Sequence, residues 1–529
     1  MIQTILKNKI YPFLLVFVFV FSYYIENAVE AYVSQTLLPL LLGLLIALVF
    51  YVVWTTIFRR EDKAAILTTY SLSAVFLHGH VKNLLDEPSI TLAGKTFGED
   101  SLVILMWGVL GIAVLLLVIR AKDSIESVTK SLNIVVLVMI ISNLILFAGL
   151  MLDGKVVVSE VAYKGKVQVN FDGPIISDDL PDIYHIVLDK YASNGVLETY
   201  FNYDNSAHTD VLEEMGFYVA YDARTNYPHT LYSLSTTLNM VYANELAEKM
   251  NADPKEVNGE LNIIYPGFRN HEVGQILTAA GYDYYHTGNW FYPTQTSSSA
   301  TENYIFNKSQ FRLGEFTDKF LQQTILEPLL GKYYILSEAN QHLEAIWFGF
   351  DKLEELVATK KSPKYIFTHL LIPHGPYVVG ADCKKLPPGT IVSDMKPLYL
   401  GSLECANTRV ESIVMQIMDD TNGNAIIIIQ SDEGPNISRA EMPRDDYTFL
   451  DMPDDIIIRR TEIQYAVYLP DQDYSLFSQD MTPINTYRII LNNILGTKFP
   501  LLEDVTYITE TQGSLIEFDF TPVDPTIYK

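Results

Sequence analysis

Long apolar runs separated by short polar connections fill the first third of the chain. Each run is about 20 residues long, which is enough for a helix to cross a bilayer. The runs cover residues 11–28, 37–58, 64–81, 102–119 and 132–152. The third run is the least apolar, and a buried or re-entrant helix is the alternative for it. We predict a transmembrane helical anchor of five spans over residues 1–152.

The pattern changes after residue 180 to short apolar runs that alternate with stretches of helix length. Strands are expected at 182–191, 216–220, 282–288, 364–372, 424–432 and 463–470, and helices near Val211, after Thr230, and over Phe316–Leu330, Ala339–Ala358 and Tyr399–Met418. Such alternation predicts an α/β domain with a mostly parallel central sheet over 181–529, with room for a small subdomain from about residue 470. A juxtamembrane linker with short strands is expected over 153–180.

Basic residues indicate the orientation of the anchor, because short cytoplasmic connections carry an excess of Lys and Arg. Basic residues lie before the first run (Lys7 and Lys9), after the second (Arg59, Arg60 and Lys63) and between the fourth and fifth (Arg120, Lys122 and Lys130). An inside N-terminus followed by five spans puts the α/β domain outside, on the outer or periplasmic face of the plasma membrane. A cleaved signal peptide is the competing interpretation of the first run, but that run lacks a clear small-residue cleavage site.

The formal net charge of −26 argues against nucleic acid as a partner. The same acidity disfavours tight docking on anionic lipid headgroups. Any lipid substrate is therefore expected to be held locally, and the composition leaves the oligomeric state open.

Two predicted strands end in carboxylates. Asp189 closes the strand near residue 182, and Asp432, Glu433 and Gly434 follow four consecutive isoleucines. Open α/β sheets bind ligands beyond the carboxyl ends of their strands, so the paired carboxylates indicate a cation site. A lone Asp after a strand is also common as a helix cap or turn residue, and the sequence does not show that the two strand ends meet.

Polar residues that follow Pro228 predict the start of a helix, with Thr230 in its first turn and Ser233 one turn later on the same side. A helix N-terminus favours an anion such as a phosphate or a threonine alkoxide. The alternative is that Thr230 is only an N-cap.

Histidines mark the end of another strand, at His369 and His374. They are compatible with metal ligation, phosphate binding or proton transfer to a leaving group. His369 alternates within the strand, so a core role is an alternative, and His374 in the following loop is the better candidate. His286 is a weaker candidate for a substrate-binding wall, the alternative being a loop histidine.

The order of these elements resembles the alkaline phosphatase and sulfatase superfamily, most closely its membrane-anchored branch of lipoteichoic acid synthases and phosphoethanolamine transferases. The resemblance implies that Asp189 and Asp432 bind metal and that Thr230 is the nucleophile. It implies that His374, and more weakly His369, binds the substrate phosphate. Two positions depart from the family: Glu433 replaces the His of Asp-His-Gly, and Lys190 stands where relatives commonly have Gly.

The first departure gives an all-oxygen candidate metal set of Asp189, Thr230, Asp432 and Glu433. One divalent cation is expected, with Mg, Mn or Ca favoured over Zn. Three carboxylates leave such a site net negative, which disfavours a phosphoryl donor and keeps an inactive protein open as an alternative. Lys190 partly offsets this charge and is expected, with Ser233, to bind substrate.

The resemblance implies an enzyme that moves a phosphoryl-linked headgroup from a membrane phospholipid to an envelope glycan or lipid through a phosphothreonine intermediate. A hydrolase of phosphate or sulfate esters and an inactive binding or scaffold protein are the alternatives. Sulfatase chemistry in the strict sense is disfavoured, because Tyr232 and Leu234 replace the Pro and Arg of the Cys/Ser-x-Pro-x-Arg pattern.

Cys383 and Cys405 are the only cysteines, and both lie in the region expected outside the membrane. A disulfide persists in such a compartment, so we expect the two to pair. Two unpaired small residues are the alternative.

Overall fold

The computed structural model describes residues 8–28, 31, 33–84, 90–92, 95–121, 125–152, 180–251, 263–291, 294–306, 315–387, 394–437, 449–509, 518 and 520–528. They form two compact units, one of residues 1–162 with 309–336 and one of residues 163–308 with 337–529. The predicted linker at 153–180 lies outside the described residues except for Leu180.

Helices form the first unit at the positions of the five apolar runs: α2 (Tyr11–Glu26), α3 (Leu37–Phe58), α4 (Glu61–Phe76), α6 (Glu99–Arg120) and α7 (Glu126–Leu152). Between them lie η1 (Val33–Thr36), α5 (His78–Asn83) and a hairpin of β1 (Ile90–Leu92) and β2 (Lys95–Phe97).

Only part of the predicted anchor has the length and composition of membrane spans. Among the described residues, three segments qualify: Val33–Phe58, Glu99–Arg120 and Glu126–Leu152. The apolar α2 has 16 residues, and α4 begins with Glu61, Asp62 and Lys63. The prediction of membrane-spanning helices is supported, whereas the count of five spans is not confirmed.

A segment expected in the α/β domain belongs instead to the helical unit. This segment, Ser309–Leu336, includes α14 (Glu315–Gln322) and the start of α15 (Leu326–Thr359). The rings of Phe316 and Tyr23 lie 5.2 Å apart, and those of Phe320 and Phe76 lie 5.6 Å apart. The domain boundary drawn from the sequence is therefore corrected for this segment, whose aromatic side chains pack onto the apolar helices.

Seven strands form the central sheet of the second unit, in the order β4-β9-β8-β3-β7-β5-β6. They are β3 (Asp182–Leu188), β4 (Tyr218–Val219), β5 (Asp283–Gly288), β6 (Glu302–Ile305), β7 (Lys364–Leu370), β8 (Ala425–Ser431) and β9 (Tyr465–Tyr468). Strands β8, β3, β7, β5 and β6 run parallel, and β9 pairs antiparallel with β8 and β4. The predicted mostly parallel sheet is confirmed.

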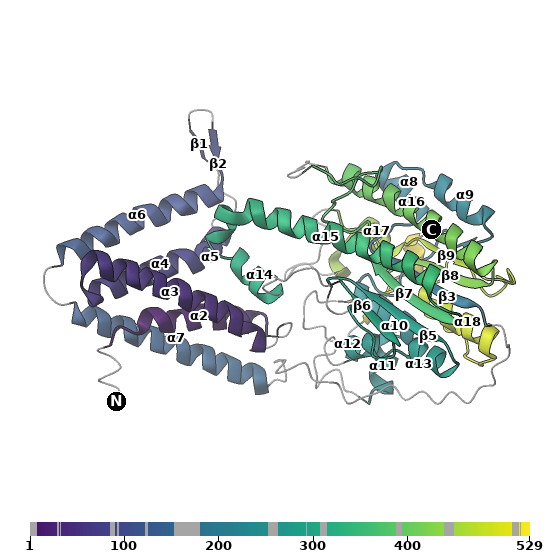
Figure 1. Ribbon diagram of the computed structural model, residues 1–529, viewed down its shortest axis with the longest axis horizontal. Helices are drawn as coiled ribbons and strands as arrows, with labels where there is room; N and C mark the ends of the chain where they lie inside the picture. Colours follow the sequence, from purple (N-terminus) through teal and green to yellow (C-terminus); the bar gives the residue numbers. More distant parts are fainter. Residues whose placement is uncertain are drawn as a thin grey trace. The chain divides into compact units, whose positions relative to one another are not determined.

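Helices cover both faces of this sheet (Figure 1). One core takes side chains from α10 (Thr230–Asn239), α11 (Ala243–Lys249), α12 (Tyr265–Arg269), α13 (Glu272–Ala279) and α18 (Thr486–Leu495). The other takes them from α8 (Asn194–Phe201), α9 (Ser206–Glu214), α15 and α16 (Lys396–Thr421). Strand β3 is buried along its whole length because alternate side chains enter the two cores.

The last part of the chain adds α17 (Asp454–Thr461) and a hairpin of β10 (Tyr507–Thr509) and β11 (Phe520–Pro522). Helix α18 packs into the first core of the sheet rather than into a core of its own. The region from residue 470 therefore extends the α/β unit.

Candidate active site

Three neighbouring strands bring the candidate residues to one edge of the sheet. Strand β3 lies between β8 and β7, with Leu188 opposite Ser431 and Val187 opposite His369. Asp189 and Asp432 each follow the last paired residue of their strand, so they lie at the same level. Because side chains alternate along a strand, His369, opposite Val187, points to the same side of the sheet as Asp189.

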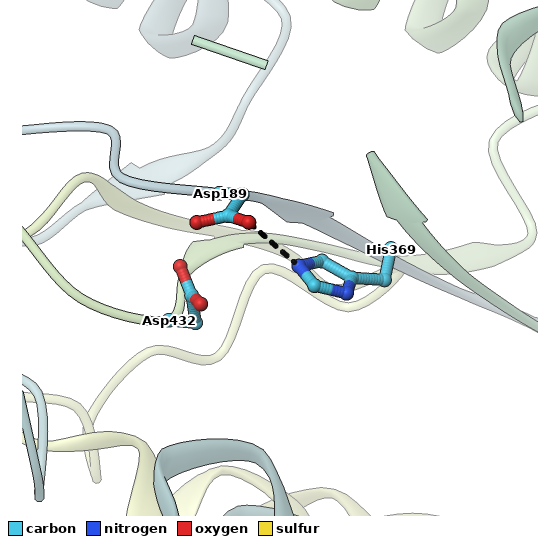
Figure 2. Close-up of side chains that lie close together, drawn as sticks. All are labelled: Asp189, His369 and Asp432. Atoms are coloured by element: carbon cyan, nitrogen blue, oxygen red, sulfur yellow. Dashed lines mark ion pairs between the residues drawn. The ribbon is translucent and has the colours of Figure 1, made fainter. Parts of the chain in front are cut away.

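The side chains of Asp189, His369 and Asp432 converge (Figure 2). One potential ligand atom from each lies within 4.8 Å of the other two, and all three residues are buried. The Nε2 atom of His369 lies 3.6 Å from Asp189 Oδ2. Among the described residues, Asp189 Oδ1, Asp432 Oδ2 and His369 Nε2 have no hydrogen-bond partner. Buried carboxylate oxygens and an imidazole nitrogen without a hydrogen-bond partner suit a cation site.

Neighbouring polar groups fix the orientation of His369. Asn289 Nδ2 donates to the His369 carbonyl at 3.0 Å and lies 3.3 Å from Nδ1, and Thr294 Oγ1 also lies 3.3 Å from Nδ1. These contacts hold one ring nitrogen and leave Nε2 turned toward the carboxylates. Hydrogen bonds to the remote nitrogen commonly orient histidines that bind metal. The role expected for His369, phosphate binding, therefore gives way to a place among the candidate ligands.

Thr230 is the first residue of α10 and sits beside Asp432. The N-cap is His229, which makes no side-chain capping bond, so the structure does not support the alternative of Thr230 as the cap. The Thr230 side chain lies close enough to the Asp432 carboxyl group to lower the pKa of that group. Leu231, Leu234 and Leu238 of the same helix are buried in the core and fix the position of α10. The candidate nucleophile thus lies at a helix N-terminus, next to the candidate metal ligands.

Glu433 lies next to Asp432 in the chain but outside the group of candidate ligands. Its carboxylate accepts a hydrogen bond from Arg460 Nη2, and Lys190 Nζ lies 3.6 Å from its Oε1. Asp432 and Glu433 follow the end of β8, and only Asp432 belongs to the convergent group. The structure therefore places His369, rather than Glu433, with Asp189 and Asp432.

This change alters the donor set. The preference for Mg, Mn or Ca rested on a site made only of oxygen atoms, whereas the convergent group contains an imidazole nitrogen. A mixed nitrogen and oxygen set also suits zinc.

Electrostatics distinguish the two aspartates. Burial raises the pKa of Asp432 to about 7, and the Asp189 carboxylate adds to the shift. Burial alone would raise the pKa of Asp189, but His374 and His369 outweigh it and hold that pKa well below its usual range. Burial likewise opposes the charged form of His369, yet Asp189 and Asp432 raise its pKa. The two carboxylates therefore repel each other unless a cation or a proton lies between them.

The charge around the site is less negative than the sequence indicated. Arg460, which is 4% exposed, and Lys190 both contact Glu433. Three carboxylates thus face two permanent cations, and a divalent ion would leave the centre net positive. A net negative charge therefore no longer disfavours a phosphate substrate at this site.

Lys190 has a left-handed backbone, with φ of 65°. This conformation explains why glycine suits the position. Its backbone N–H donates to Asp432 Oδ1 at 3.1 Å, and its Nζ donates to Asn436 at 2.6 Å.

His374 lies in the loop after β7, where the charges of Asp189, Lys190 and Glu433 affect its pKa. Burial lowers its pKa, and Asp189 partly offsets the shift. His342 of α15 holds this loop through a hydrogen bond from Nε2 to the His374 carbonyl at 3.2 Å, and accepts one from Trp290 on Nδ1 at 3.2 Å. The position of His374 agrees with contact to a substrate bound beside the metal group.

Two expected substrate-binding residues are internal. Ser233 is fully buried, and its hydroxyl lies 3.0 Å from Thr225 Oγ1. His286 is buried in β5, with its ring nitrogens bonded to the Tyr284 hydroxyl at 3.0 Å and the Thr294 carbonyl at 2.8 Å. Neither side chain has a polar atom available to a substrate, so both expectations are corrected to structural roles.

Cys383 and Cys405 form a disulfide, with their Cα atoms 5.0 Å apart. The bond links the loop region that follows His374 to α16.

Several residues of the site carried no signal in the sequence. Arg460, Thr225, Asn289, Thr294 and His342 were not among the predicted site residues, because they lie far along the chain from their partners. The basic pair Arg459 and Arg460 was visible, but only the fold shows which of the two turns inward.

These features define an α/β domain with a candidate metal centre and a threonine at the carboxyl edge of its sheet. Residues 187–461 match the model of the Sulfatase family, and the chain belongs to this family. The matched segment contains Asp189, Thr230, His369 and Asp432.

Solved structures give low-identity matches. The periplasmic domain of EptC from Escherichia coli is 13% identical, with a TM-score of 0.41, covering 67% of this chain and 96% of that chain. The integral membrane lipooligosaccharide phosphoethanolamine transferase A of Neisseria meningitidis is 11% identical, with a TM-score of 0.36, covering 93% and 95%. The putative sulfatase yidJ of Bacteroides fragilis is 14% identical, with a TM-score of 0.36, covering 65% and 83%. With TM-scores this low, these structures carry no conclusion about function. A search of the curated proteins finds no match to this sequence.

Proposed function

We propose that the protein is a membrane-bound, metal-dependent transferase that moves a phosphoryl-linked headgroup from a phospholipid to an envelope glycan or lipid. The observation that carries the proposal is the convergence of Asp189, His369 and Asp432, with unpartnered ligand atoms, beside Thr230 at the start of α10. A hydroxyl nucleophile next to a cation site is the arrangement that phosphoryl transfer through a covalent intermediate needs.

Asp189, Asp432 and His369 would hold one divalent cation, with the Thr230 oxygen as a further ligand. When bound, such a cation supplies Lewis-acid charge that favours the ionised Thr230 hydroxyl and offsets the charge of a phosphodiester. The nitrogen donor supports zinc and manganese as well as the hard cations.

Each residue then has a distinct task. Thr230 Oγ1 attacks phosphorus, and the bond from phosphorus to the diacylglycerol oxygen breaks. His374 gives that oxygen a proton as it leaves. An acceptor hydroxyl attacks the phosphothreonine, returns a proton to His374 and releases Thr230. Lys190 and the helix N-terminus stabilise the charged phosphoryl oxygens throughout.

The location of the reaction is part of the proposal. Membrane-spanning helices precede the α/β unit, and the basic connections favour an inside N-terminus. We therefore place the α/β unit on the outer or periplasmic face of the plasma membrane, where lipid donors and envelope acceptors occur together.

A hydrolase of phosphate or sulfate esters is the second candidate, favoured by the match to the Sulfatase family model. It uses the same residues with water as the final acceptor. The two differ in what they need: a hydrolase turns over soluble esters without an acceptor, whereas the transferase releases diacylglycerol and transfers the headgroup.

The test combines metal analysis of the purified full-length protein with mass spectrometry of the peptide that contains Thr230. We expect one divalent ion per chain, and phosphate or the headgroup phosphate on Thr230 after incubation with fluorescent phospholipids of different headgroups. Thr230→Ala should keep the metal site and release no diacylglycerol. A wild-type protein with neither metal nor modified Thr230 would make the enzymatic proposal wrong and leave the binding or scaffold alternative.

A further inference from the structure

Arg460 connects the segment that precedes Thr230 to the segment that follows Asp432. Its Nη2 atom donates to the Pro228 carbonyl at 2.8 Å, two residues before Thr230, and also to the Glu433 carboxylate, one residue after Asp432. A terminal guanidinium nitrogen carries two hydrogens, so one atom can serve both acceptors. The pair is 4% and 5% exposed, which makes its geometry rigid and poorly screened by solvent.

Further contacts hold the same junction. The N–H of Gly434 donates to the Arg460 carbonyl at 2.9 Å. A Cβ at Gly434 would lie 2.0 Å from the Arg459 carbonyl oxygen, so only glycine fits this approach of the loop to α17. Thr225 Oγ1 lies 2.6 Å from the Asp432 carbonyl oxygen and 3.0 Å from Ser233 Oγ of α10. The end of β8 and the start of α10 are thus fastened together on two sides.

We propose that Glu433 is the counterion of Arg460 rather than a metal ligand, and that the Glu433–Arg460 pair is a positioning device that sets Thr230 against Asp432. It accounts for the position of the Glu433 carboxylate, which pairs with Arg460 and lies outside the group of Asp189, His369 and Asp432. Lys190 Nζ lies 3.6 Å from the other carboxylate oxygen of Glu433. The inference rests on the proposed function for its catalytic consequence, but not for its structural one.

The structural consequence is tested on the full-length protein by hydrogen exchange of the peptide covering residues 226–236, together with metal content. In Arg460→Met, and to a smaller degree in Glu433→Gln, the first turn of α10 should exchange about tenfold faster. Both variants should keep the metal content of the wild type. Loss of the metal in Glu433→Gln, or unchanged exchange in Arg460→Met, would overturn the inference.

The catalytic consequence is read from diacylglycerol release. Misplacement of the nucleophile should lower kcat by about 10²-fold in Arg460→Met while KM changes little. Arg460→Lys, which keeps the charge and can still donate to both acceptors, should recover at least part of this loss. An Arg460→Lys variant as slow as Arg460→Met, or a loss confined to KM, would contradict a positioning role.

Two further variants guard against misfolding and general effects. Glu433→Gln combined with Arg460→Met removes both charges of the pair, and its kcat should match that of Arg460→Met alone because the two residues act as a unit. A fully additive loss would count against the pair. Arg459→Met is the matched control, since Arg459 is the neighbouring arginine and pairs with the exposed Asp455 at 3.2 Å. A wild-type protein that releases no diacylglycerol, with the expected exchange pattern in the variants, would remove the proposed function and leave the positioning role intact.

Discussion

Asp432 is the residue at which metal binding and stability oppose each other. Its pKa, raised to about 7 from 3.8, means that the folded, metal-free protein prefers the protonated carboxyl. This group therefore contributes most to stability at low pH, and the contribution is lost as the pH rises through about 7. Metal binding reverses the preference, because the ligand atom must be ionised.

We expect Asp432→Asn to unfold at a higher temperature than the wild type in EDTA at pH 8. The gain should be of order a few kcal/mol, at roughly 1.4 kcal/mol per unit of pKa shift, and should shrink toward pH 5. With metal added, the order should reverse, since the variant loses a ligand. Thermal unfolding across pH 5–8, with and without metal, checks this.

The control for that experiment is Asp473→Asn, because Asp473 is exposed in a loop. Its unfolding temperature should not rise above that of the wild type at pH 8, and its response to added metal should match that of the wild type. A metal-free Asp432→Asn protein less stable than the wild type at pH 8 would show that the two carboxylates do not repel each other.

Lys190 combines a backbone constraint with a charge, and the two can be separated. A left-handed φ of 65° costs a non-glycine residue about 1–2 kcal/mol. Lys190→Gly should remove this cost and Lys190→Met should retain it, while both lose the charge beside the phosphate. We expect KM for a phospholipid donor to rise by about tenfold in both variants.

The unfolding temperature distinguishes the two variants. Lys190→Gly should be the more stable one, since only glycine removes the backbone strain at this position. Thermal unfolding and steady-state kinetics on the same preparations give both readouts. An unchanged KM in both variants would mean that Lys190 serves Glu433 and Asn436 only.

The sequence revealed part of the site at this scale. Asp189, Asp432 and Thr230 stand at the ends of strongly patterned elements, and those elements formed where the pattern predicted. The assignment of Glu433 could not be made from the sequence, because its partner Arg460 lies in α17, outside any motif. His369 was undervalued because the pairing of β7 with β3 is not visible in the chain.

At the scale of elements, the disulfide ties the loop region after β7 to α16. Cross-linking a loop of this size stabilises the fold by about 3 kcal/mol in the chain-entropy model. We expect the double variant Cys383→Ser with Cys405→Ser to unfold at a lower temperature, and reduction of the wild type to give the same shift. Thermal unfolding with and without reductant checks this.

The double variant is its own control, because reductant should not change it further. Equal unfolding temperatures for the oxidised and reduced wild type would show that the bond does not constrain the unfolded chain.

Strands were predicted more faithfully than helix boundaries. The buried runs of β3, β7 and β8 are unambiguous because both faces are covered by helices. Helix α15, by contrast, runs through the break expected between Leu330 and Ala339. The short α11, α12 and α17 gave no periodic signal, since their burial depends on tertiary packing.

At the scale of the whole molecule, the number of membrane crossings is set by charge as well as by length. The basic clusters after α3 and after α6 lie on the same side only if α4 crosses between them. With α3, α6 and α7 as the only spans, one of these clusters would lie outside, against the positive-inside rule. The charge pattern therefore favours crossing by α2 and α4, although their composition does not identify them as spans.

The number of membrane crossings can be tested by labelling single cysteines on intact cells with a membrane-impermeant maleimide. The paired native cysteines do not react, Ser34 is exposed between α2 and α3, and a Cβ at Gly98 meets open space before α6. Five spans predict labelling of Ser34→Cys and Gly98→Cys from outside, with Asn8→Cys labelled only after lysis. Three spans with the α/β unit outside predict labelling at Gly98→Cys but not at Ser34→Cys. Ser34 decides between the two because, with the α/β unit outside, Ser34 lies outside only if α4 crosses, and Asn8 then shows whether α2 crosses as well.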